Sequence, residues 1–184
     1  MCCVSSQPGS TLVAVQPSAA SPCLRSGSGL ITMTNRSQEE PRTCHQIAAD
    51  SDGIRFTSCK ESLYISLNYH RSSSGTVHAK SIWALSRADE CHCFCEAEIR
   101  EWYDEKGDCW SISKDAKVEF GTRGEVVAFF DSPTNKTDPW HGYPIGGRRG
   151  LPVHRRPPDK LIEEWHRSGW ISYVVYSRLI GGRL

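Results

Sequence analysis

Residues 62–70 have the sequence SLYISLNYH, in which side chains of two kinds alternate along the chain. If this stretch is extended, one side carries Leu63, Ile65, Leu67 and Tyr69. Tyr64, Ser66 and Asn68 lie on the other side. A repeat of two residues is typical of a strand with one buried face. The stretch therefore predicts a half-buried β-strand, and the residues RSSSG at 71–75 predict a turn after it.

Further short strands are predicted along the middle of the chain. Residues 91–99, CHCFCEAEI, alternate again, and CWSIS at 109–113 follows the turn-forming residues 106–108. Residues 117–120 and 125–130 flank GTRG, which suggests one more hairpin. Short consecutive strands joined by tight turns predict a small antiparallel β-meander sheet.

The last 28 residues favour helices. Pro157 and Pro158 suit the start of a helix, Asp159 places a negative charge at its positive end, and Gly169 suits its end. The apolar stripe of this helix would be Leu161, Ile162 and Trp165. Residues 171–180 predict a second helix, although their Tyr and Val content also permits a strand. The predicted fold class is α+β, with the meander sheet followed by a C-terminal helical pair.

The chain of 184 residues suits one domain, preceded by a segment of different composition. Residues 1–32 are rich in Ser, Pro, Gly and Ala, and they contain no acidic residue and a single basic one, Arg25. This composition predicts a disordered tail. Met33 is a candidate true start of the protein. We expect a partly ordered lead-in at residues 33–53 and a single α+β domain at 54–184.

The cysteine count and hydropathy indicate the compartment. The nine cysteines are an odd number and no secretory signal precedes them, which favours reduced thiols and a cytoplasmic location. No apolar run approaches the roughly 20 residues that span a bilayer, so a membrane partner is not expected.

Charge is distributed unevenly along the chain. Residues 33–140 contain 13 basic and 18 acidic residues, whereas residues 141–184 contain 8 basic and 3 acidic ones. A basic end of this kind suits a nucleic acid or an acidic protein partner. Alternatively, the two halves neutralise each other within the fold.

The most unusual stretch is DPWHGYPIGGRRGLPVHRR at residues 138–156, where aromatic and basic side chains occur among glycine and proline. Its candidate binding residues are Trp140, His141, Tyr143, Arg148, Arg149, Arg155 and Arg156. Trp, Tyr and Arg are enriched in protein interfaces, and the same set could stack on bases and pair with phosphates. The favoured interpretation is a non-catalytic module that binds a protein partner through Trp140 to Arg156. Nucleic-acid binding and a purely structural connector are alternatives.

An enzyme is the other interpretation of this stretch. His141 would act as general acid or base, with Asp138 orienting its ring, His154 as a second imidazole and Arg148 or Arg149 binding an anion. These roles suit a hydrolase or nuclease acting on a phosphate-containing substrate. Because no catalytic motif is complete, a protein that is not an enzyme is favoured.

The cysteines suggest a metal site less strongly. The candidate zinc ligands are Cys91, Cys93, Cys95 and Cys109, with Cys59 or Cys44 and His45 as further ones. In an extended strand, alternate side chains are about 7 Å apart, which is too far for two thiolates on one zinc ion. Buried core thiols are therefore the favoured interpretation. No cofactor is predicted, and zinc is the alternative.

Overall fold

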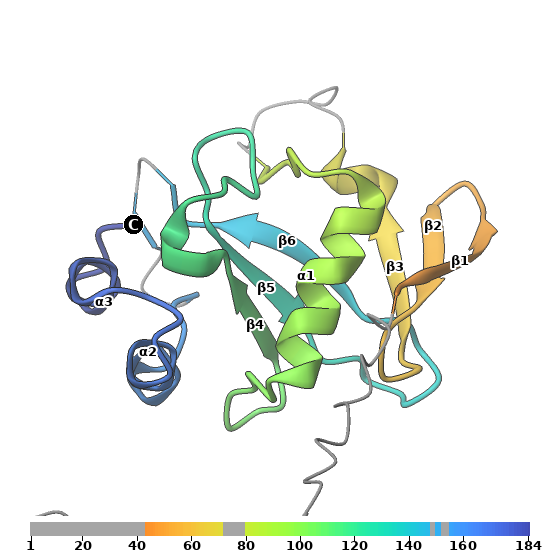
Figure 1. The fold of residues 1–184 in the computed structure, drawn as a ribbon. Helices are drawn as coiled ribbons and strands as arrows, with labels where there is room; N and C mark the ends of the chain where they lie inside the picture. Colours follow the sequence, from red (N-terminus) through yellow and green to blue (C-terminus); the bar gives the residue numbers. More distant parts are fainter. Residues whose placement is uncertain (1–42, 72–79, 148–149, 152–154) are drawn as a thin grey trace, which may run out of the picture. The chain divides into compact units, whose positions relative to one another are not determined.

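The computed structural model describes residues 43–71, 80–147, 150–151 and 155–184. These residues form six β-strands, three α-helices and two 3₁₀ helices, η1 (Asn68–His70) and η2 (Lys114–Ala116) (Figure 1). The predicted tail at residues 1–32, the candidate start at Met33 and residues 33–42 of the lead-in lie outside the described residues, as do 72–75 of the predicted turn. In the part of the chain that is described, every helix is too short or too polar to span a bilayer.

The first sheet contains β1 (His45–Ala49), β2 (Gly53–Thr57) and β3 (Leu63–Leu67), paired antiparallel in that order. The strand predicted from residues 62–70 is therefore confirmed. The side chains that are fully buried are nevertheless Tyr64 and Ser66, while Leu63 is exposed. The physical reason is a buried carboxylate, that of Glu90, which accepts hydrogen bonds from both hydroxyl groups.

Residues 87–99 form helix α1 (Arg87–Ile99), so the strand predicted at 91–99 is wrong. Ser86 begins the helix, because its hydroxyl accepts a hydrogen bond from the amide of Asp89. Cys91 and Cys95 are four residues apart, and this spacing places two side chains on one side of either a strand or a helix. The alternation of cysteines could therefore not distinguish the two structures.

The second sheet contains β4 (Cys109–Ile112), β5 (Val127–Asp131) and β6 (His141–Ile145), again antiparallel. The strands predicted near 109–113 and 125–130 are confirmed. No strand forms at 117–120, because the amides of Phe120 and Gly121 both donate to the carbonyl of Glu125 and close a turn. Strand β6 is a correction of the predicted contact loop, since five of its residues pair with β5.

The two sheets are joined at Trp140, directly before β6. Its amide donates to the carbonyl of Leu63 and its carbonyl accepts from the amide of Ile65, both at 2.8 Å. This short parallel pairing places β6 beside β3. The face of β6 and the end of β3 therefore border the same region of the molecule.

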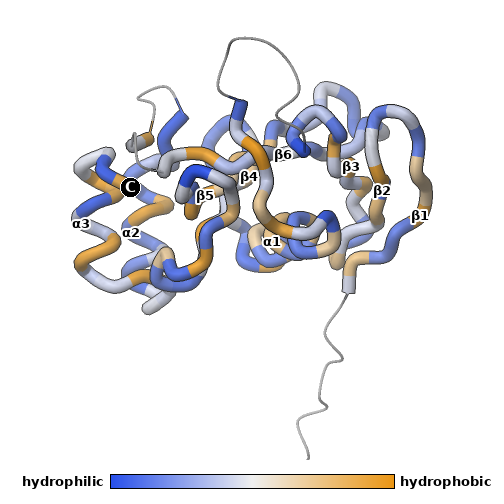
Figure 2. Tube along the Cα trace, turned by 90° about the horizontal axis from the view of Figure 1, so that it is seen from above, coloured by the Kyte–Doolittle hydropathy of each residue, from blue (hydrophilic) through white to orange (hydrophobic). Residues whose placement is uncertain are grey.

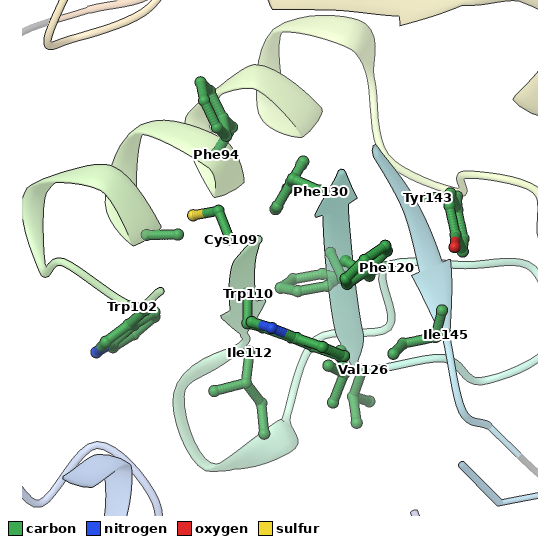
Figure 3. Close-up of a cluster of buried hydrophobic side chains, with 14 of the residues drawn as sticks. Phe94, Trp102, Cys109, Trp110, Ile112, Phe120, Val126, Phe130, Tyr143 and Ile145 are labelled. Carbon is green, nitrogen blue, oxygen red and sulfur yellow. The ribbon is translucent and has the colours of Figure 1, made fainter. Parts of the chain in front are cut away.

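Helix α1 packs against β4 and β3 (Figure 1), and the core lies between them. Phe94 is at its centre, with its ring 5.1 Å from Tyr64, 5.2 Å from Phe130 and 5.2 Å from Trp140. Figure 3 shows the same core continuing through Trp110 and the side chains of β5 and β6. Large aromatic rings therefore account for much of the buried surface.

The C-terminal helices α2 (Asp159–Arg167) and α3 (Tyr173–Ile180) confirm the predicted helical pair and, with the antiparallel strands, the α+β class. They pack against each other, and Figure 2 shows hydrophobic segments in both. Trp165 of α2 is buried edge-to-face on Trp102, at 5.5 Å between the rings. Gly169, with φ of +71°, ends α2 in a left-handed conformation that favours glycine.

Candidate functional site

The aromatic residues of the predicted contact loop are used largely for packing. Trp140 is partly buried against Phe94 and Tyr103, and Tyr143 is 8 % exposed within β6. Side chains in these positions present little surface to a partner. The aromatic contribution to an interface that we expected from this stretch is therefore small.

The arginines of the stretch lie in different surroundings. Arg148 and Arg149, together with His154, lie outside the described residues. Arg156 forms an ion pair with Asp159 at the start of α2. Arg155 is exposed, and its guanidinium lies over the ring of Tyr143, 5.1 Å from the ring centroid. Among the described arginines of the stretch, Arg155 is the one placed beside the sheet face.

His141 has a carboxylate neighbour, but it is not the predicted one. Its Nε2 atom lies 3.5 Å from Oδ2 of Asp131, its register partner on β5. The carboxylate of Asp138 instead accepts a hydrogen bond from the side-chain amide of Asn135 at 2.8 Å. The carboxylate that the register of β5 and β6 places beside His141 is therefore that of Asp131. Both side chains are partly open to solvent, at 38 % and 46 % exposure.

A second imidazole, that of His70 in η1, lies on the same face. Its ring stacks on Tyr143, with 5.3 Å between centroids and 25° between planes, and its Nδ1 atom is 3.1 Å from the carbonyl oxygen of Ser81. Burial lowers the pKa of His70, the hydrogen bond with Ser81 opposes this shift, and electrostatic interactions with His141, Lys80 and Arg71 add to it. His70 is therefore neutral near pH 7.

The neighbours of the two histidines have pKa values displaced by burial. Burial raises the pKa of Asp131, although the nearby His141 opposes this shift. Burial also raises the pKa of Tyr143 to about 12, so its phenol stays protonated and can donate a hydrogen bond. We call His70, Asp131, His141, Tyr143 and Arg155 the sheet-face cluster.

One member of the sheet-face cluster, His141, lines a groove of about 450 Å³. The groove is lined by Ser51, Asp52, Ile65, Leu67, Asn68, Tyr69, Pro139 and His141. His141 therefore has Asp131 near one ring nitrogen and lies on the wall of an open groove. Perturbed titratable groups beside a concave surface are typical of functional sites.

The cysteines form a second group of reactive side chains. Cys91 and Cys95 of α1 come together with Cys44, which precedes β1, and Cys59, which lies between β2 and β3. In the described part of the chain, the group of three possible metal-ligating atoms contains Cys44, Cys59 and Cys95, and none of Cys91, Cys93 and Cys109 belongs to it. Of the four predicted metal candidates, Cys95 is therefore in this group, Cys91 lies beside it, and Cys93 and Cys109 are outside it.

Several of these residues could not be found in the sequence. His70 and His141 are 71 positions apart, and their proximity depends on the pairing of β3 with Trp140. The sequence did not indicate that Asp131 lies beside His141, because β6 was not expected to be a strand. For the cysteines, a weak signal was present in the sequence, since Cys44 and Cys59 were further candidate ligands of a metal site.

The comparisons with other proteins add no further constraint. The chain matches none of the protein-family models, curated proteins or solved structures with which it was compared.

Proposed function

We propose that the sheet-face cluster binds a phosphate-bearing substrate and that His141 acts there as general acid or base. One observation carries this proposal: His141, with its Nε2 atom 3.5 Å from Asp131, lines an open groove. A catalytic imidazole needs such an oriented ring and such access to substrate. The protein would then be a hydrolase or a nuclease.

The other members of the cluster have roles that fit this chemistry. Neutral His70 can accept a proton from the attacking water or hydroxyl group as its oxygen bonds to phosphorus. His141, ion-paired with Asp131, can donate a proton to the leaving oxygen as the old phosphorus–oxygen bond breaks. Arg155 supplies positive charge for the phosphate. The proposal thus uses two imidazoles in different environments.

The test is hydrolysis of a panel of phosphomonoesters, phosphodiesters and RNA by the purified full chain. His141→Ala and Asp131→Asn should each reduce kcat by about 10²-fold or more without unfolding the protein. The matched control is His92→Ala, because His92 is an exposed histidine of α1 whose Nδ1 atom lies 4.0 Å from a carboxylate, that of Asp89. Full activity in His141→Ala would overturn the proposal.

A second candidate function is binding of a protein partner, for which the C-terminal helices provide a surface. Tyr173 and Val174 of α3 are 69 % and 59 % exposed, and they line a groove of about 490 Å³ with Arg178 and Arg183. Exposed apolar side chains beside arginines suit a partner with an apolar and acidic segment. This moves the expected contact from Trp140–Arg156 to the adjoining helical pair.

The partner hypothesis is tested with a partner identified by crosslinking and then purified. Changing Tyr173 and Val174 together to Ser should weaken its affinity at least about tenfold. Ile47→Ser, on exposed strand β1, is the control. Equal affinity of the double variant and the wild type would remove this surface from consideration.

Two further expectations belong with these proposals. Nucleic-acid binding corresponds to the first proposal with RNA or DNA as the ligand, and its affinity should then fall steeply with salt. A cytoplasmic location is proposed from the nine cysteines of the chain, an odd number that favours reduced thiols. The salt dependence of nucleic-acid affinity can be measured with the purified protein, and its location can be examined in its cells of origin.

A further inference from the structure

Four cysteine side chains from three separate segments converge beside α1. The Sγ atoms of Cys44 and Cys95 are 3.0 Å apart, and the thiols of Cys44, Cys59 and Cys95 all lie within 4.8 Å of one another. Cys91, one helical turn before Cys95 on α1, lies beside Cys44 and Cys95 but outside this group of three mutually close thiols. We call these four residues the thiol cluster.

Local structure holds three of the four side chains in place. Cys91 and Cys95 are one helical turn apart on α1, where residues i and i+4 lie on the same face. Cys59 lies in a turn that Ser58 closes, because its hydroxyl accepts hydrogen bonds from the amides of Lys60 and Ser62. The pair Cys91 and Cys95 is thus held by α1, and Cys59 is held by a separate turn.

The environment of Cys95 resembles that of a metal-bound sulfur. The amide of Cys59 donates a hydrogen bond to Sγ of Cys95 at 2.9 Å. Outer hydrogen bonds of this kind orient the ligands of metal sites and reduce the charge on them. A thiol packed only as a small apolar side chain would not need this contact.

The distances suit a tetrahedral zinc ion. Zinc–sulfur bonds of about 2.3 Å in a tetrahedron place the sulfur atoms about 3.8 Å apart. The thiols of Cys44, Cys59 and Cys95 fit this spacing, since Cys44 and Cys95 are 3.0 Å apart and all three lie within 4.8 Å of one another. The sequence-based objection to zinc is the spacing of about 7 Å that alternate side chains have when residues 91–95 are extended. It does not apply, since these residues are helical.

We propose that Cys44, Cys59, Cys91 and Cys95 together bind one zinc ion. Four thiolates fill a tetrahedral coordination sphere, so the site is structural and leaves no position for a substrate. The metal would tie Cys44, at the start of β1, and the β2–β3 turn to α1. This metal link would strengthen the attachment of the first sheet to α1, because every residue of β1 is exposed and β3 makes the main contact of that sheet with α1.

The competing explanation for the short Cys44–Cys95 separation is a disulfide bond. A disulfide would join these two sulfur atoms at about 2.05 Å and would not include Cys59 or Cys91. The two explanations differ in metal content and in the mass of the peptides that contain Cys44 and Cys95. One preparation of the full chain can therefore distinguish them.

The experiment measures zinc by elemental analysis in the full chain purified without chelator, followed by replacement with cobalt(II). We expect about one zinc per chain and, for cobalt, the visible spectrum of a tetrahedral ion with thiolate charge transfer. Less than about 0.2 equivalents in the wild type, with no such cobalt spectrum, would overturn the proposal. A Cys44–Cys95 disulfide found by mass spectrometry would overturn it equally.

Variants assign the ligands. Cys44→Ser and Cys95→Ser should each lower the zinc content below about half an equivalent. Cys93→Ser is the matched control, because Cys93 lies on α1 between two ligands but outside the thiol cluster, and it should keep about one equivalent. A triple change of Cys2, Cys3 and Cys23 to Ser should also keep the metal. Retention of zinc and the cobalt spectrum by Cys95→Ser would contradict the assignment.

Discussion

The ring of His70 stacks on the ring of Tyr143, 5.3 Å away and inclined by 25°. This contact brings a short helix after the first sheet onto a strand of the second one. It also buries the imidazole, and burial lowers the pKa of His70 from its ordinary value near 6.5. Protonation of His70 is therefore less favourable in the folded chain than in the unfolded chain.

The first prediction concerns pH and stability. Below about pH 6.5 the unfolded state binds more protons at His70 than the folded state, so the free energy of unfolding should fall as pH falls through this window. Above it, His70 should contribute no pH dependence. Urea unfolding of the wild type and of His70→Gln between pH 5 and 8 provides the measurement. Equal pH dependence in the two proteins would contradict the lowered pKa.

The second prediction concerns the buried carboxylate of Glu90. It accepts hydrogen bonds from Tyr64 at 2.6 Å and Ser66 at 2.7 Å, and it pairs with Arg71. Glu90→Ala should lower the free energy of unfolding by about 3–5 kcal/mol, because it leaves a largely buried guanidinium and two hydroxyl groups without their acceptor. Chemical denaturation measures the change.

Its control is Glu96→Ala on the same helix. Glu96 forms an exposed ion pair with Arg100, so its removal should cost less than about 1 kcal/mol. If the two variants were equally stable, Glu90 would not be the acceptor that holds β3 on α1.

The third prediction concerns Gly142 in β6. A Cβ atom built at this position would lie 2.1 Å from Cδ1 of Phe130 and 2.8 Å from the carbonyl oxygen of Phe129. Gly142→Ala should therefore separate β6 from β5 and lower the free energy of unfolding by about 1–3 kcal/mol. Gly107→Asn is the control, since nothing lies within 4 Å of its Cβ position and Asn tolerates the positive φ of that turn. Wild-type stability of Gly142→Ala would show that β6 is placed differently.

Parts of this fold could be predicted from local chemistry. The alternation at residues 62–70 identified β3, and Pro157, Pro158 and Gly169 bounded α2. Polarity failed to indicate the burial of β3, because Tyr64 and Ser66 donate hydrogen bonds to the buried Glu90, which lies 26 and 24 positions away from them, respectively. Such a partner has no signature within the strand itself.

Strand β6 shows a different limit. Gly142, Pro144 and Gly146 are typical of a loop, yet β6 pairs with β5 at the edge of its sheet, where proline is tolerated. The candidate site depends on this strand, since β6 brings His141 beside Asp131. The thiol cluster likewise depends on tertiary structure, because its four residues span 51 positions between Cys44 and Cys95.

We propose that phosphate binds at the sheet-face cluster beside His70, His141 and Arg155. The most direct measurement is an NMR titration of the full chain with inorganic phosphate, following the ring protons of every histidine. We expect saturable shifts at His70 and His141, weakened in Arg155→Gln, with the shifts of His92 and His166 unchanged. Shifts at His70 and His141 no larger than those at His92 would contradict it.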